Sequence, residues 1–184
     1  MSSHLRVAAA LGLLTAALSA GGATAAETRA SAGQGDMPAA LALSPAEVVA
    51  LTLSAKGTQN YECRSKQGAQ AQHEWVFVAP EAELFDDSGK KIGKHYAGPT
   101  WEITNDESKV VGEVKARADS PEPDAVPWLL LAVKEPAKQG AFARVTSVQR
   151  AETHGGKPPA GPCKPGEMRK VPYTAVYHFA RPKT

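Results

Sequence analysis

From residue 44 to the end of the chain, short runs of β-branched and aromatic residues alternate with strong turn signals. The clearest run is 171–179, where Tyr173, Ala175, Tyr177 and Phe179 occupy every second position. A period of two is the side-chain pattern of a strand with one buried face. Fourteen prolines and sixteen glycines interrupt the chain too often for a bundle of long helices. The pattern predicts an all-β domain, a single antiparallel β-sandwich or barrel of about eight short strands.

Several other stretches carry specific expectations. Residues 44–53 begin like a capped helix, but their Val, Leu and Thr content favours a strand. Residues 73–79 are apolar on both faces, which is typical of a central or sandwiched strand. The apolar run 127–133 is bracketed by prolines and predicts a buried strand, and 142–150 predicts another. The glycines and prolines of 153–166 predict an irregular loop.

The N-terminal region has the pattern of an export signal. Residues 1–26 combine a polar start, an apolar stretch (7–20) and small residues at 23–25 that suit a signal peptidase, so we expect a cleaved signal peptide rather than an uncleaved anchor. Residues 27–43 are rich in Ala, Gly and Ser and predict a flexible leader, followed by a β domain at 44–184. No later run approaches the roughly 18 apolar residues of a membrane span. The expected location is secreted or periplasmic.

The charge balance excludes some partners. Without the one arginine of the signal peptide, 20 of the 21 basic residues remain beside all 19 acidic ones. Such a nearly neutral chain has no basic stripe for nucleic acid, and we expect no nucleic-acid partner.

Two cysteines, Cys63 and Cys163, remain after the expected cleavage. In an oxidising compartment an even, widely spaced pair predicts a disulfide, which would close a loop of about 100 residues. A two-cysteine metal site and free thiols are the alternatives. Neither cysteine has a second ligand at the spacing of a zinc site, so we expect no metal and no cofactor.

No familiar catalytic or phosphate-binding string occurs, and the strongest local cluster is HYAGPTWE at 95–102. A turn at its Gly-Pro pair could bring Tyr96 to Trp101, or His95 to Glu102. A His–Glu pair can transfer protons, and aromatic and polar groups at a turn can bind a ligand. The other interpretation is structural: aromatic core residues beside a histidine that bonds a backbone carbonyl.

The remaining histidines give weaker signals. His73 shares a strand face with Trp75 and could add to a binding site. His154 lies in the expected loop and should be solvated, and His178 lies opposite the tyrosine face of its strand and should be exposed. No two histidines have the spacing of a metal-binding pair on one helix or strand.

The order of several motifs resembles one family. These motifs are GTQNYEC, HEWVFVAPEAELFD, GKHYAGPTWE, SKVVGEV, VPWLLLAV, VTSVQRAETHGGKPP and VPYTAVYHF. The chain is similar to the exported "domain of unknown function 3455" family of bacterial and fungal proteins. The resemblance implies secretion and offers no activity or catalytic residue. A fainter similarity, through Tyr61-Glu62-Cys63 and Cys163, is to the periplasmic inhibitors of C-type lysozyme.

Our leading hypothesis is a non-catalytic module that binds an unknown small molecule or an envelope protein. Its candidate ligand-binding residues are His73, Trp75, His95, Tyr96, Trp101 and Glu102. One alternative is an enzyme that uses His95 and Glu102 as a pair. The other is an envelope structural or hydrolase-inhibitor protein with a projecting loop at 153–166 and no pocket.

Overall fold

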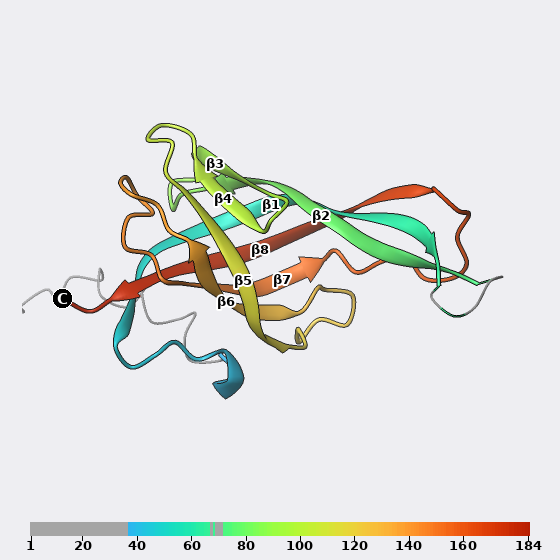
Figure 1. Ribbon diagram of the computed structural model, residues 1–184, viewed down its shortest axis with the longest axis horizontal. Coiled ribbons are helices and arrows are strands. Elements are labelled where there is room, and N and C mark those ends of the chain that lie inside the picture. Colours follow the sequence, from blue (N-terminus) through green and yellow to red (C-terminus); the bar gives the residue numbers. More distant parts are fainter. Residues whose placement is uncertain (1–36, 67, 69–71) are drawn as a thin grey trace, which may run out of the picture. The chain divides into compact units, whose positions relative to one another are not determined.

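A computed structural model of the chain describes residues 37–66, 68 and 72–184, so the expected signal peptide lies outside the described residues. In this part of the chain, eight antiparallel strands follow one another around a closed barrel (Figure 1). Closure decides between the two predicted architectures in favour of the barrel. The strands, preceded by a 3-10 helix η1 (Ala39–Leu41), are β1 (Glu47–Ser65), β2 (His73–Phe85), β3 (Lys91–Tyr96), β4 (Thr100–Ile103), β5 (Lys109–Ala118), β6 (Trp128–Glu135), β7 (Ser147–Gly155) and β8 (Met168–Pro182).

The barrel closes because β8 pairs with both β7 and β1. Tyr173, Ala175, Tyr177 and Phe179 are all buried, as their alternation predicts. The stretch 44–53 is strand rather than helix, since β1 begins at Glu47.

β1, β2 and β8 are longer than the other strands and continue past the barrel (Figure 1). We call this extension the arm: residues 61–65 of β1, 73–77 of β2 and 168–170 of β8. The prediction that 73–79 is buried on both faces is wrong, because Phe77 and Val78 are 49% and 43% exposed. The apolar run lies where β2 leaves the closed barrel, so no second layer covers it.

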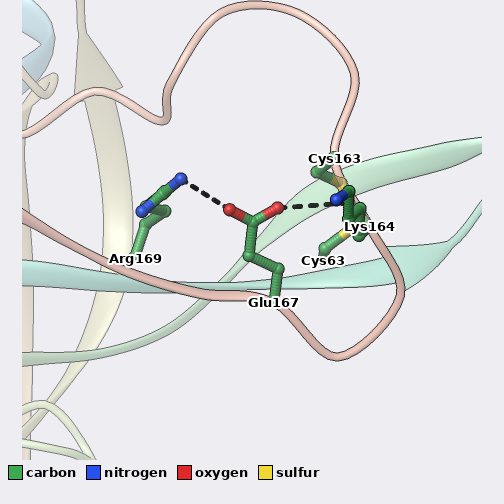
Figure 2. Close-up of a disulfide and its surroundings, with 5 residues drawn as sticks. All are labelled: Cys63, Cys163, Lys164, Glu167 and Arg169. Carbon is green, nitrogen blue, oxygen red and sulfur yellow. Dashed lines mark hydrogen bonds and ion pairs between the residues drawn. A yellow bond between two sulfur atoms is a disulfide. The ribbon is translucent and has the colours of Figure 1, made fainter.

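The predicted disulfide is confirmed: Cys63 of the arm is bonded to Cys163, with Cα atoms 5.8 Å apart. Two backbone hydrogen bonds join the same two segments. The Cys63 N–H donates to the Glu167 carbonyl oxygen (2.8 Å), and the Gly166 N–H donates to the Cys63 carbonyl oxygen (3.0 Å). The Glu167 carboxylate accepts from the Lys164 N–H (3.2 Å) and pairs with Arg169 (2.6 Å; Figure 2). The turn between β7 and β8 is therefore fastened to β1.

Two predicted boundaries differ from the structure. The strand expected at 142–150 begins only at Ser147, and the preceding residues turn so that Phe142 and Val145 enter the core. Phe142 packs against Phe179 with ring centroids 4.6 Å apart. The loop expected from residue 153 begins later, because β7 continues to Gly155.

The last residues before β1 cover part of the outer face of the barrel. Leu41 of η1 is fully buried against Trp128 and Ala151, and its carbonyl oxygen accepts from Gln149 Nε2 (2.6 Å). His178, in register with Gln149, is only 6% exposed and bonds the Thr52 hydroxyl (3.0 Å). The expectation that His178 is exposed is therefore wrong. Strand alternation identifies the outer face of a barrel but not the chain segments that cover it.

Candidate functional site

The barrel interior contains a cavity of about 420 Å³. Fully buried lining residues include Gln59, His95, Trp101, Leu131 and Tyr177. Exposed residues that also line it are Phe77, Val78, Arg117 and the turn residues Ala97 and Gly98, which mark its mouth. The cavity therefore runs from the buried core to solvent, with a largely apolar wall.

The HYAGPTWE motif forms the β3–β4 hairpin at this mouth. Its turn has three residues, Ala97 to Pro99, so that Tyr96 pairs with Thr100 and His95 with Trp101. Gly98 has φ +133°, a conformation that L residues with side chains rarely adopt, which explains glycine at this position. A turn of two residues would give the pairs Tyr96–Trp101 and His95–Glu102; the third turn residue shifts the register by one.

The inward-facing pair of the hairpin is His95 and Trp101. Their rings are stacked, with centroids 4.6 Å apart and an interplanar angle of 11°. His95 Nδ1 donates to the Thr100 carbonyl oxygen (2.8 Å), because a carbonyl can only accept. The pKa of His95 is lowered to about 3, mainly by burial; the bond to Thr100 opposes this shift, and the Arg150 charge adds a smaller lowering. The imidazole is therefore neutral at physiological pH.

The outward-facing pair is Tyr96 and Glu102. The Tyr96 hydroxyl donates to Glu102 Oε2 (2.7 Å), and Lys94 lies 3.1 Å from Glu102 Oε1. The hydrogen bond to Glu102 raises the pKa of Tyr96 to about 12, while the bonds from Tyr96 and Lys94 lower the pKa of Glu102. His95 and Glu102 therefore lie on opposite faces of the sheet, and the hypothesised catalytic pair does not form.

The other candidates lie elsewhere. His73 and Trp75 belong to the arm, and neither they nor Tyr96 and Glu102 line the cavity. The turn after β7 is joined to the arm by the disulfide, and a cavity is present where the structural or inhibitor alternative expects none.

Two buried donors in the barrel core lack hydrogen-bond partners. Trp101 Nε1 and Gln59 Nε2, on side chains 1% and 2% exposed, make no hydrogen bond. The Gln59 amide lies beside the Tyr173 hydroxyl and helps to lower its pKa, which burial raises more strongly, but the two groups do not reach good hydrogen-bond geometry. A buried donor without an acceptor costs about 1–3 kcal/mol. Because both nitrogen atoms have almost no accessible surface, they do not open onto the cavity.

Two positively charged residues, Arg150 and Arg117, line the cavity. Arg117 of β5 pairs with Leu129 of β6, and Leu129 pairs with Arg150 of β7, so the two arginines flank one leucine at the same level of the barrel. Arg150 Nε and Nη2 donate to the Pro127 carbonyl oxygen (3.1 and 2.8 Å). Burial raises the pKa of Tyr177, and the neighbouring Arg150 charge opposes that rise.

Sequence reasoning missed Gln59, Tyr61, Arg150 and Tyr177 as site residues. The alternation of β8 places Tyr177 inside, but Gln59 and Arg150 have polar neighbours in the sequence, at 58–60 and 149–152, and do not stand out there. A polar residue at an inward position of a strand is the signal that could have found them. This signal can be recognised only when it is known which residues of the strand face inward.

A closed eight-stranded meander with an internal cavity open at one end defines the class: a small β-barrel that can enclose a ligand. The chain belongs to the family described as "Protein of unknown function (DUF3455)", whose family model matches residues 44–181. This confirms the family resemblance. No curated protein matches the chain.

No helix among residues 37–66, 68 and 72–184 is long and apolar enough to cross a membrane. In the same ranges, no group of three or more His, Cys, Asp or Glu side chains is arranged to hold a metal ion.

The depressed pKa of His95 predicts a loss of stability in mild acid. The unfolded chain takes up a proton near the ordinary histidine pKa of 6.5, whereas the folded protein does not until the pH approaches 3. Stability is therefore complete above about pH 6.5 and falls as the pH drops toward 3, by about 2 kcal/mol between pH 7 and pH 5. Burial also lowers the pKa of His178, which adds a loss in the same direction.

Urea unfolding of the wild type and His95→Gln at both pH values measures the His95 contribution. The variant should lose about 2 kcal/mol less than the wild type over this interval, because glutamine does not titrate. The partly buried carboxylates with lowered pKa, such as Glu47, titrate below their usual 4.5 and contribute little above pH 5. Equal losses in the two proteins would contradict a buried neutral His95.

Proposed function

We propose that this protein is a non-catalytic binding module that holds a small, largely apolar molecule inside its barrel. The cavity carries the proposal: it joins an apolar wall of Val114, Leu129 and Leu131 to a few polar side chains, among them Arg150. Binding sites for small molecules combine this kind of wall with a few fixed polar groups. A catalytic role has less support, because His95 is neutral and stacked and Glu102 faces outward.

The cavity volume limits the ligand. About 420 Å³ lies in the range of small-molecule pockets and equals the share of roughly 14 waters at about 30 Å³ each. The cavity therefore has room for a single small ligand.

The proposal also includes export of the protein from the cytoplasm. The Cys63–Cys163 disulfide is what proteins of an oxidising compartment form, and the first 26 residues have the pattern of a signal peptide. We therefore place ligand capture outside the cytoplasm, in the periplasm or beyond the cell. The leader at 27–43 would join the signal peptide to the β domain, with its last residues packed on the barrel through Leu41.

Titration with the uncharged fluorescent probe N-phenylnaphthylamine tests the binding function. The wild type should take up one probe per chain with increased fluorescence. Val114→Phe, which enlarges a side chain of the cavity wall, should weaken probe binding at least about tenfold because the phenyl ring occupies ligand volume.

The matched control is Val111→Phe, on the same strand but not among the cavity-lining residues. It should bind the probe like the wild type. Absence of probe binding by the folded wild type, or equal weakening by both substitutions, would overturn a cavity-based binding function.

A further inference from the structure

We infer that the ligand of the cavity carries an anionic head group, of the carboxylate class, and that Arg150 binds this group. The inference rests on the proposed binding function and names the ligand class for the same cavity. It follows from the charges, the donors and the apolar surface at the mouth.

Among the described residues, those that line the cavity carry positive charges and no negative ones. Arg117 and Arg150 line it, and no Asp or Glu of the described ranges does. Neither arginine forms an ion pair with any carboxylate in the part of the chain that the structure describes. A positive charge withdrawn from water without a counter-ion is costly, and a bound anion would remove much of that cost.

Arg150 is placed to receive the anion. It is half-buried on β7, and two of its N–H groups hold the Pro127 carbonyl oxygen. Its guanidinium also lies beside the Tyr177 hydroxyl and helps to lower the pKa of that group, which burial raises more strongly. A guanidinium has five N–H donors in a fixed plane, so these contacts orient the group while leaving donors for an anion.

A carboxylate has the chemistry that the free donors of Arg150 require. It offers acceptors only, on two oxygens, and so matches the planar donor fork of a guanidinium. An alcohol could satisfy the donors but not the charge, and an ammonium group would be repelled by the arginines.

The apolar body of the ligand has a continuous path to the mouth. Leu129, Leu131 and Val114 form the inner wall, and Phe77 and Val78 lie at the opening with nearly half of their surface exposed. With the head group at Arg150, the apolar tail extends toward these two side chains and covers them.

Competition at neutral pH with three ligands that share one alkyl chain tests the inference. Decanoate, decanol and decylamine are added below micelle-forming concentrations to the complex of wild-type protein with N-phenylnaphthylamine. Decanoate should displace the probe at a concentration at least about tenfold lower than decanol or decylamine. The preference should shrink with added salt, which screens the charge interaction.

Three single variants locate the anion. Arg150→Met should reduce the preference for decanoate over decanol to within about threefold, and Arg150→Lys should retain part of it, because the charge remains without the planar fork. Lys115→Met, which removes one positive charge from an exposed position on β5, should keep the full preference.

The outcomes separate the two claims. If the probe binds and all three ligands displace it equally, the binding function stands and the anionic class is wrong. If Arg117→Met rather than Arg150→Met removes the preference, the anion binds on the β5 side of Leu129 and the assignment to Arg150 is wrong. If neither the probe nor any of the three ligands binds, the proposed binding function fails as well.

Discussion

Replacing Cys63 and Cys163 together by alanine is expected to lower the free energy of unfolding by about 4.7 kcal/mol. The disulfide joins residues 100 positions apart, so its loss restores the freedom of a very long loop in the unfolded chain. Most of the effect lies in the unfolded state, because backbone hydrogen bonds between Cys63 and the Gly166–Glu167 turn remain. Urea unfolding should show a lower midpoint and a larger m-value, since the uncrosslinked chain exposes more surface.

Reduction of the wild type provides the control for the disulfide prediction. Under reducing conditions the wild type should lose nearly the same stability, while the double alanine variant should not respond to the reductant. A difference below about 1 kcal/mol between the oxidised and reduced wild type would show that the fold does not depend on the bridge.

Trp101→Ala is expected to cost about 3–5 kcal/mol of stability, the usual range for removing a buried tryptophan. Trp101 is 1% exposed and stacks on His95. Its ring also meets the edges of Tyr177 and Phe179 at centroid distances of 5.4 and 6.0 Å, so truncation opens the centre of the aromatic cluster. Thermal or urea unfolding measures the loss.

Two other substitutions sharpen the Trp101 prediction. Trp101→Phe should cost less than half as much, because a ring still stacks on His95 and the lost indole N–H has no hydrogen-bond partner. Trp75→Ala, in the arm and only partly buried, should cost much less than Trp101→Ala. If Trp75→Ala and Trp101→Ala cost the same, the barrel centre is not the main source of stability.

The HYAGPTWE motif shows which features of a hairpin the local sequence predicts and which it does not. The motif predicts a hairpin with a glycine at the turn, and β3 and β4 form that hairpin. Its chemistry depends on whether the turn has two residues or three. The third residue pairs His95 with Trp101 inside the barrel and turns Glu102 outward, which removes the catalytic pair and leaves a stacked, neutral imidazole on the cavity wall.

The cavity itself could not be read from the chain. Arg150 lies in β7, Gln59 in β1 and Trp101 in β4, and only the registers of a closed barrel bring them to one space. The exposed run at Phe77 illustrates the same limit. Its apolar pattern predicts burial, yet the length of β2 beyond the barrel determines that the run faces solvent at the cavity mouth.

The sequence by itself determined the strand-rich class, the inward face of β8 and the cysteine pair, because alternation, turn residues and cysteine number are local properties. Tertiary structure alone decided that the sheet closes, which partners meet across it and where it leaves a void. Closure depends on pairing β8 with β1, residues far apart in the chain. A period of two identifies the residues that share a face, but only the strand neighbours and their registers decide what that face encloses.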